Sequence, residues 1–206
     1  MLGIIDYGMG NLLSVKNAVE YLGHEVEIIT SANEVENYDK LILPGVGAFP
    51  DCMNNLNKKG FVEILQNQVV DNKKPILGIC LGMQVMATIG NELIKTSGLN
   101  WIDGEVELMQ VTDKQYRIPH VGWAETFIKN HFIFDGIKSI PEFYFVHSYH
   151  MKCLNESNVI ATINHQNNYT AAICKNNIIG CQFHPEKSQE LGLLVLKNFI
   201  TKNFNA

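Results

Sequence analysis

The chain has 206 residues, of which 46% are hydrophobic and 18% are charged, and its formal net charge is -5. A chain of this length fits one ordinary domain and can bury roughly 70% of the surface that its unfolded form exposes, so we expect residues 1–206 to form a single domain. The acidic balance argues against a nucleic-acid partner, because such partners usually require a basic patch, and no Lys or Arg cluster is seen.

The first half of the chain alternates between apolar strand-like runs and amphipathic helices. The run from Leu2 to Ile5 predicts a strand, and Asn11 is placed to cap a helix that ends at Gly23. Further strands are predicted at "EVEIIT", "KLILPG" and "PILGI", with a helix through Phe61 and Val69 before the last of these. This alternation predicts an α/β fold with a parallel sheet and helices on both faces.

The pattern changes after Gly98. The runs "GEVELMQV", "QYRIPHV", "HFIF" and "FYFVHSY" are short, with no good helix between them, which predicts a mixed or antiparallel section. The chain then continues with the predicted strands "NVIATI", "YTAAICK" and "NIIGCQF", and closes with a helix around Leu191 to Ile200.

The cysteines and the N-terminal segment indicate a cytoplasmic protein. Five cysteines are present, an odd number, and their wide spacing suits a reducing compartment better than a disulfide scaffold. The segment "MLGIIDYGMG" has no basic region and reaches Asp6 after a very short apolar run, so we do not expect a signal peptide. No window of about 18 apolar residues exists, so no membrane span is expected either.

Cys80 stands between two glycines at the end of a predicted buried strand, in the stretch "PILGICLGMQ". A strand followed by a sharp turn and a helix is the geometry of a nucleophile elbow, in which small flanking residues let the backbone bend. A helix beginning at Leu81 would point its first amides at the sulfur and favour a thiolate. The alternative is that Cys80 is simply a small buried hydrophobic residue.

His184 and Glu186, in the stretch "FHPEKS", supply the base and the carboxylate that a cysteine hydrolase needs. In an extended segment, residues two apart face the same way, so both side chains can reach one side of the chain. Pro185 favours this arrangement, because it moves His184 away from helical geometry. We therefore predict that Cys80, His184 and Glu186 act together.

The stretch "LILPGVGAF" is a predicted strand that ends in Pro44, Gly45, Val46 and Gly47. Glycines let the backbone approach a ligand and turn its amides toward it, so this loop and the Leu81 N–H could together form an oxyanion hole. Taken alone, the same residues would be interpreted as a plain turn.

With "PGVGAF", "GICLGMQ" and "FHPEKS" in this order, the chain resembles the class I, triad-type glutamine amidotransferases. The resemblance runs essentially from end to end, because "IIDYGMGNL", "RIPHVGW", "FYFVHSY" and "FHPEKSQELGL" are similar to the glutaminase subunits of imidazole glycerol phosphate synthases. It implies a three-layer, flavodoxin-like fold with a central, mostly parallel sheet, helices on both faces and a smaller antiparallel section.

The resemblance also implies a reaction and a set of site residues. The Cys80 thiolate would attack the side-chain carboxamide of glutamine, with His184 moving protons and Glu186 holding the imidazole. The amides expected around the oxyanion are those of Gly45, Val46, Gly47 and Leu81. The residues expected to contact the substrate glutamine are Gln84, Ser148 and Tyr149. Neither a metal nor a cofactor is expected.

A protein partner follows from the same resemblance. Ammonia would pass into a (β/α)8-barrel cyclase subunit, with which the chain would form a heterodimer that acts in histidine biosynthesis. The segments Arg117 to Trp123 and Tyr144 to His150 are expected to lie toward this partner, with Trp123 as an anchor. We expect the glutaminase to be nearly idle until the cyclase is occupied, when a backbone flip in "PGVG" would complete the oxyanion hole.

One residue departs from the family pattern. The family usually follows Gly-Trp with asparagine, and here Ala124 takes that place. The acceptor of the ammonia is therefore open, and a paralogous amidotransferase subunit that serves a surface-polysaccharide sugar is an alternative. A non-catalytic scaffold subunit and another thiol hydrolase are weaker alternatives, because Gln84 and "FVHSY" favour one small amino-acid substrate.

Overall fold

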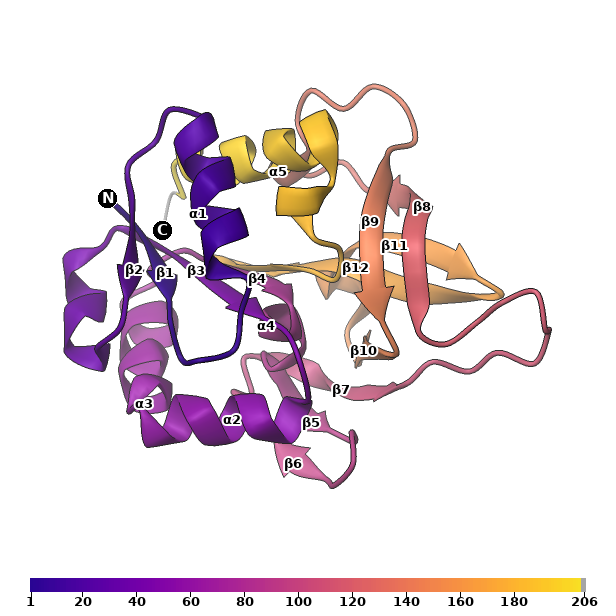
Figure 1. The fold of residues 1–206 in the computed structure, drawn as a ribbon, viewed down its shortest axis with the longest axis horizontal. Helices are drawn as coiled ribbons and strands as arrows, with labels where there is room; N and C mark the ends of the chain where they lie inside the picture. The colour runs from indigo at the N-terminus through magenta and orange to yellow at the C-terminus, as the bar shows by residue number, and fades with distance from the viewer. Residues whose placement is uncertain (205–206) are drawn as a thin grey trace.

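The computed structural model describes residues 1–204, in which a nine-stranded sheet forms the middle layer (Figure 1). Its strand order is β2-β1-β3-β4-β13-β12-β11-β8-β9, and the first five strands of that order pair in parallel. With β13 as the fifth strand, this half has the flavodoxin-like order. The bounds are β1 (Leu2–Ile5), β2 (Val26–Ile29), β3 (Lys40–Gly45), β4 (Ile76–Cys80) and β13 (Ile178–Cys181).

The antiparallel section is larger than expected, because it forms the other half of the main sheet and also contributes to a second sheet. In the main sheet the antiparallel strands are β8 (His120–Ile128), β9 (Glu142–His147), β11 (Val159–His165) and β12 (Asn167–Lys175). The second sheet has the order β10-β7-β5-β6. Its strands are β5 (Ala87–Gly90), β6 (Thr96–Ser97), β7 (Ile102–Leu108) and β10 (Tyr149–Cys153).

Helices cover both faces of the main sheet, as the sequence predicted (Figure 1). On one face lie α1 (Leu12–Tyr21) and α5 (Gln189–Thr201), and they share one hydrophobic core with the strands. On the other face lie α2 (Phe49–Lys58) and α3 (Phe61–Leu65), which share a second core with the strands of the small sheet. The three-layer α/β architecture is therefore confirmed.

Several local expectations need correction. The segment "HFIF" does not form a strand, because Phe132–Phe134 forms the 3-10 helix η3. Asn11 stands at the N-cap position of α1, but its side chain makes no capping hydrogen bond. Short helical segments also occur at α4 (Leu81–Gln84), η1 (Ala32–Asn37), η2 (Gln66–Asp71), η4 (Glu156–Asn158) and η5 (Pro185–Lys187).

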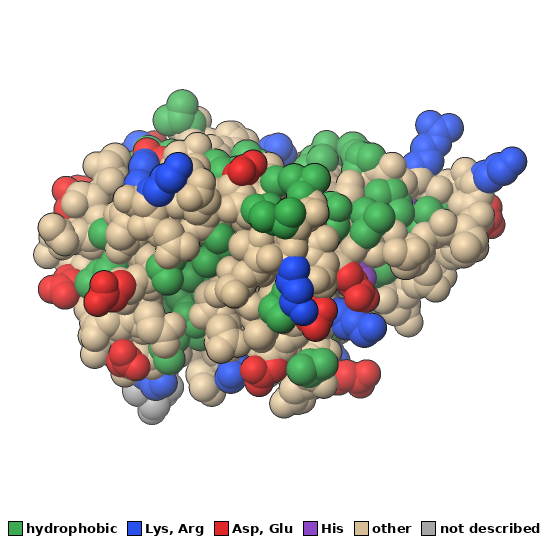
Figure 2. All heavy atoms as spheres, turned by 90° about the horizontal axis from the view of Figure 1, so that it is seen from below, with side chains coloured by type: hydrophobic (Ala, Val, Ile, Leu, Met, Phe, Trp, Pro, Cys, Tyr) green, Lys and Arg blue, Asp and Glu red, His purple; other side chains and the backbone are tan. Residues whose placement is uncertain are grey.

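The surface carries charges of both signs, mixed rather than gathered into one field. In the space-filling view, Lys and Arg side chains are interspersed with Asp and Glu, and hydrophobic side chains form adjoining groups between them (Figure 2). On this face, the surface lacks the continuous basic stripe that nucleic-acid binding requires. Among residues 1–204, no helix combines the length and the apolar character needed to cross a membrane.

Candidate active site

Cys80 occupies a strained turn at the carboxyl end of β4. It is the last residue of the strand and immediately precedes α4, and its backbone has φ 54° and ψ -110°. A positive φ is uncommon for a residue with a side chain, and such strain clusters at functional sites. Strand, turn and helix thus have the order of a nucleophile elbow. The helix α4 is a single turn, so its dipole acts on the sulfur less than a long helix would.

The glycines around Cys80 are required by close packing. A Cβ atom on Gly78 would lie 2.6 Å from the carbonyl oxygen of Gly82, and a Cβ atom on Gly82 would lie 1.8 Å from the carbonyl oxygen of Leu43. Both obstacles are backbone atoms, which cannot rotate away as a side chain can. The turn therefore packs directly on β3, and only glycine fits at either position.

His184 and Glu186 form a buried pair just beyond the end of β13. The Nδ1 atom of His184 lies 2.9 Å from Oε1 of Glu186, and the two side chains are only 2% and 1% exposed. The histidine is held from its backbone as well, because its N–H donates to the carbonyl of Tyr144 and its carbonyl accepts from the Ser188 hydroxyl. The pair is therefore fixed in position by η5 and β9.

The pKa of His184 reports the groups on both sides of its ring. Burial alone would lower this pKa, but the nearby Cys80 sulfur and the hydrogen-bonded Glu186 carboxylate outweigh it and raise it to about 9. The Nε2 atom is buried and makes no hydrogen bond of ordinary geometry. Cys80 and His184 nevertheless line one cavity. The imidazole thus has one nitrogen held by Glu186 and one nitrogen free beside the sulfur.

The cavity at Cys80 has a volume of about 330 Å³, within the usual size of small-molecule sites. Most residues that the sequence assigned to the oxyanion and the substrate lie in it. Gly45 does not line the cavity, but it is the register partner of Cys80 on the neighbouring strand β3. The lining residues are Val46, Gly47, Cys80, Leu81, Gln84, Glu92, Pro119, Val146, His147, Ser148, Tyr149 and His184.

Gln182 is a site residue that the sequence analysis missed. Its side chain is fully buried, and its amide nitrogen donates to the Cys80 sulfur at 3.6 Å. Its amide oxygen accepts from Gln84 at 3.0 Å. The signal lay in the strand pattern, because "NIIGCQF" and "PILGI" were both predicted strands and residues at the carboxyl ends of neighbouring parallel strands meet.

Glu92 was also missed, and no sequence motif indicated it. It follows β5 and lines the cavity, and its carboxylate accepts a hydrogen bond from the backbone N–H of Phe49 at the start of α2. This contact fixes the carboxylate at the edge of the cavity. His147, within the motif "FVHSY", lines the cavity as well.

The chain is similar to known proteins along nearly its whole length. Residues 3–203 match the family model described as glutamine amidotransferase class-I. The chain is 41% identical to the imidazole glycerol phosphate synthase subunit HisH of Pelagibacter ubique, over 96% of this chain and 97% of that one. It is 45% identical to the subunit HisH 1 of Campylobacter jejuni, over 97% of this chain and 99% of that one.

Solved structures show the same fold. A crystal structure of a glutamine amidotransferase superposes with a TM-score of 0.75 at 18% identity, covering 97% of this chain and 99% of that one. The PurLQS structure from Thermotoga maritima gives a TM-score of 0.74 at 16% identity, covering 97% and 96%. Together with the match along nearly the whole sequence, these likenesses establish that the chain belongs to the class I glutamine amidotransferase family.

Proposed function

We propose that this chain is the glutaminase subunit of an imidazole glycerol phosphate synthase and hydrolyses glutamine for histidine biosynthesis. The observation that carries the proposal is the meeting of Cys80, on its strained turn, with the buried pair of His184 and Glu186 at one cavity. Identities of 41% and 45% to subunits with that name, over nearly the full length, support the choice of synthase.

The reaction begins when the Cys80 thiolate attacks the carboxamide carbon of glutamine. A sulfur–carbon bond forms, and the negative charge that develops on the oxygen is stabilised by backbone amides of Leu81 and the loop after Gly45. His184 gives its proton from Nε2 to the leaving nitrogen, so the carbon–nitrogen bond breaks, ammonia departs and a thioester remains. Throughout, Glu186 keeps the imidazole oriented through Nδ1.

Water completes the cycle. It attacks the thioester carbon while His184 accepts one of its protons, and the carbon–sulfur bond then breaks to release glutamate and the thiolate. The imidazole is again protonated and stands beside the thiolate. The raised pKa of His184, about 9, suits this role, because the proton is held near neutral pH until a leaving group needs it.

The cavity has groups for both ends of an amino-acid substrate. The carboxylate of Glu92 can pair with the ammonium group of glutamine, while Ser148 and Tyr149 offer hydrogen-bonding groups for the rest of the molecule. Gln84 also lines the cavity, although its amide nitrogen is engaged by the Tyr149 carbonyl and by Gln182. These contacts favour a small, zwitterionic amide as the substrate.

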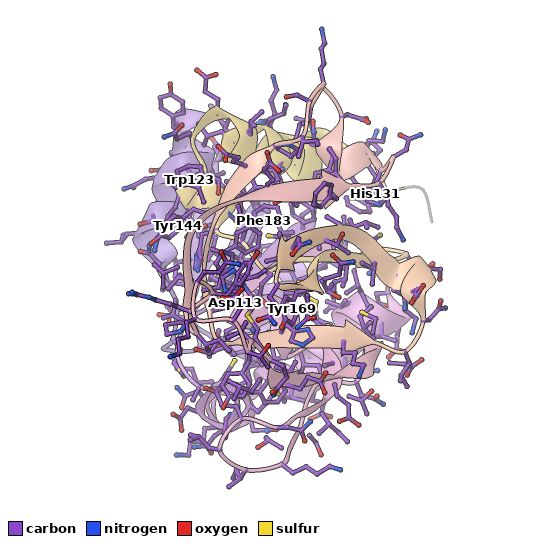
Figure 3. All side chains as sticks on the ribbon, turned by 90° about the vertical axis from the view of Figure 1, so that its right-hand side faces the viewer. Asp113, Trp123, His131, Tyr144, Tyr169 and Phe183 are labelled. Atoms are coloured by element: carbon purple, nitrogen blue, oxygen red, sulfur yellow. The ribbon has the colours of Figure 1, made fainter. Side chains whose placement is uncertain are left out.

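The edge hairpin of β8 and β9 is the surface that we assign to the barrel cyclase partner. Trp123 is 44% exposed and Val121 is 57% exposed, and their register partners are Tyr144 and Val146. Trp123 and Tyr144 lie side by side at this edge, with ring centroids 6.0 Å apart (Figure 3). An exposed apolar strip anchored by aromatic side chains is typical of protein interfaces. Ammonia released at Cys80 would leave toward this side.

The test is turnover of the complex with a (β/α)8-barrel cyclase subunit, in which glutamate and imidazole glycerol phosphate are both measured. Cys80→Ala is expected to lower glutamine-dependent turnover by at least about a thousandfold, while synthesis from added ammonium salt persists. The matched control is Cys174→Ala, because Cys174 is also a free cysteine, is more exposed than Cys80 and does not line the cavity. Unchanged glutamate release by Cys80→Ala would refute the enzyme function.

One residue, Ala124, favours a different acceptor for the ammonia. Ala124 lies on β8, opposite Phe143 of β9, in the same hairpin as the exposed strip. Two relatives carry numbered names, the subunit HisH 1 of Campylobacter jejuni and the subunit HisH 2 of Methanococcus maripaludis. If this chain serves a surface-polysaccharide sugar instead, glutaminase activity will rise with a sugar-amidating partner and not with the histidine-pathway cyclase.

A further inference from the structure

Gln182 stands at the same level as the nucleophile on the neighbouring strand. Strands β4 and β13 pair in parallel with Cys181 opposite Ile79, so the next residues along, Gln182 and Cys80, follow in the same register. On the other side of β4, Gly45 of β3 is the partner of Cys80. Three adjacent strand ends therefore meet at the sulfur, and the Gln182 side chain is the one that touches it, at 3.6 Å.

The direction of the Gln182 amide is fixed by a chain of hydrogen bonds that begins at a backbone carbonyl. The Tyr149 oxygen can only accept, so Gln84 must present its amide nitrogen to it, at 2.9 Å. The same nitrogen donates to Gln182 at 3.0 Å, which requires the oxygen of Gln182 on that side. The N–H group of Gln182 must then face the sulfur of Cys80.

The Tyr149 carbonyl oxygen, where this series of hydrogen bonds begins, also contacts a histidine. The Nδ1 atom of His147 lies 2.8 Å from the Tyr149 oxygen, and because that oxygen accepts, Nδ1 carries the proton. Burial lowers the pKa of His147 to about 3, so this histidine stays neutral near neutral pH. The Tyr149 carbonyl therefore receives two donors of fixed direction, and the amide chain cannot reverse.

We propose that Gln182 stabilises the ionised form of the Cys80 sulfur by donating its amide N–H to it, with Gln84 fixing the direction of that donor. A thiolate accepts such a bond more strongly than a neutral thiol does, because hydrogen bonds to a charged form favour that form. The amide adds no charge of its own, so it supports the thiolate without competing with the imidazolium of His184. This inference rests on the proposed function, since it concerns the same nucleophile.

Other titratable groups near the sulfur do not supply this donor. They are His184, Glu186, Tyr7, Cys181, Glu92 and His147. Burial raises the pKa of both the Tyr7 hydroxyl and the Cys181 thiol well above their ordinary values, so both stay neutral near pH 7. Neither donates to the sulfur, because the Tyr7 hydroxyl makes no hydrogen bond of ordinary geometry and the Cys181 thiol donates to the Gly78 carbonyl at 3.8 Å. His184 is then the cation beside the sulfur, and Gln182 is the neutral donor.

The experiment is the rate of alkylation of Cys80 by iodoacetamide in the full chain, followed on the Cys80 peptide by mass spectrometry from about pH 5.5 to about pH 9.5. Gln182→Met keeps the length of the side chain and removes the donor. Gln182→Glu keeps the shape and the contact with Gln84, but places a carboxylate against the sulfur. Gln68→Met is the matched control, because Gln68 is also a buried glutamine, but its amide donates to Asn67 and not to Cys80.

Gln182→Met is expected to slow alkylation at neutral pH by about tenfold or more, and to regain the wild-type rate at high pH, where ionisation no longer limits. Gln182→Glu is expected to shift the curve further in the same direction, while Gln68→Met leaves it unchanged. A merely structural role would lower the melting temperature without moving the curve along the pH axis.

Three results would contradict the inference. If wild type and both Gln182 variants give superimposable curves, Gln182 does not act on the sulfur, although the proposed glutaminase function survives. If wild-type Cys80 reacts no faster than Cys174 and the complex releases no glutamate, the reactive thiolate does not exist and both proposals fail together. If a Gln84 substitution added to Gln182→Met returns the curve toward that of the wild type, the assigned direction of the hydrogen bonds is contradicted.

Discussion

His184 is held to Glu186 through Nδ1 at 2.9 Å, while its Nε2 atom is buried beside Cys80 without a hydrogen bond of its own. A buried polar atom without a partner costs free energy unless it has another use. In the proposed mechanism, the free nitrogen is the one that gives a proton to the leaving group and accepts one from water. The imidazole of His184 therefore has one nitrogen bound to Glu186 and one nitrogen that faces Cys80. Removing the Glu186 carboxylate has a predictable result.

Replacing Glu186 with glutamine is expected to lower kcat for glutamine hydrolysis by at least about a hundredfold, with little change in KM. The amide can still contact Nδ1, but it no longer stabilises the imidazolium or fixes the required tautomer. Steady-state glutamate release by the complex checks this prediction. Glu190→Gln is the control, because Glu190 lies in the first turn of α5, outside the cavity. Equal losses in both variants would contradict it.

The raised pKa of His184 makes a prediction about stability. The ordinary value is 6.5 and the folded value is about 9, so between these pH values the folded state keeps a proton that the unfolded state releases. The free energy of unfolding therefore has its full contribution below about pH 6.5 and loses it as the pH rises to about 9, by up to roughly 3 kcal/mol. Urea unfolding of wild type against His184→Gln isolates this contribution.

The titration of His120 and His147 does not contribute to stability changes in this pH range. Burial lowers the pKa of His120 to about 4 and that of His147 to about 3. Their folded values lie below the unfolded value, so their effect on stability falls on the acid side of pH 6.5. A constant difference between wild type and His184→Gln from about pH 6.5 to about pH 9 would show that His184 is not charged in the folded state.

Continuous apolar runs predicted the strands that carry the site, because parallel strands that are buried on both faces have apolar residues throughout. The helix α2 was not predicted, although Phe49, Cys52, Met53 and Leu56 are buried at helical spacing. Its intervening asparagines have low helix propensity, whereas Pro50 lies in the first turn, where proline is tolerated, and the helix is stabilised by packing on the sheet rather than by local preference.

Pairs that are close in sequence could be predicted at the site, and pairs that depend on the register of distant strands could not. His184 and Glu186 are two residues apart, so their pairing could be predicted, but the extended backbone expected there is wrong, because Glu186 lies in the 3-10 helix η5 (Pro185–Lys187) and only His184 is extended. The contact of Gln182 with Cys80 depends on which strand lies next to β4, which the motifs alone do not specify. Glu92 reaches the cavity only because the second sheet folds beside α2.

Gly82 is expected to tolerate no side chain. A Cβ atom there would lie 1.8 Å from the Leu43 carbonyl oxygen, so Gly82→Ala must push β3 and the turn at Cys80 apart. We expect a loss of at least about 3 kcal/mol in the free energy of unfolding, or failure to fold. Gly23→Ala is the control, because Gly23 has φ 80° but open space around it, and should cost only about 1 kcal/mol. Thermal unfolding of both variants decides the comparison.

Trp123→Ala is expected to weaken binding of the proposed barrel cyclase partner by about 2 kcal/mol or more, because exposed aromatic side chains in an apolar strip are typical interface anchors. Stability of the isolated chain should change little, since Trp123 is 44% exposed. Calorimetric titration of the two subunits measures the effect. Tyr21→Ala is the control, because Tyr21 is 79% exposed at the end of α1 and lies outside the β8–β9 hairpin. Equal affinities for wild type and Trp123→Ala would place the interface elsewhere.

Loss of the hydroxyl group should lower the free energy of unfolding at Tyr38 but not at Tyr7. The Tyr7 hydroxyl is buried against Cys52 and Gly45 and makes no hydrogen bond of ordinary geometry, whereas the Tyr38 hydroxyl donates to Glu27 at 2.7 Å.

Removing an unpartnered buried hydroxyl relieves a desolvation cost, so Tyr7→Phe is expected to leave the free energy of unfolding unchanged or to raise it by about 1 kcal/mol. Tyr38→Phe removes the hydrogen bond to the exposed Glu27 carboxylate, which water then solvates, and should lower it by about 1 kcal/mol. Urea unfolding near neutral pH measures both. A loss in Tyr7→Phe as large as that in Tyr38→Phe would mean that the Tyr7 hydroxyl has a hydrogen-bond partner beneath the Gly45 loop.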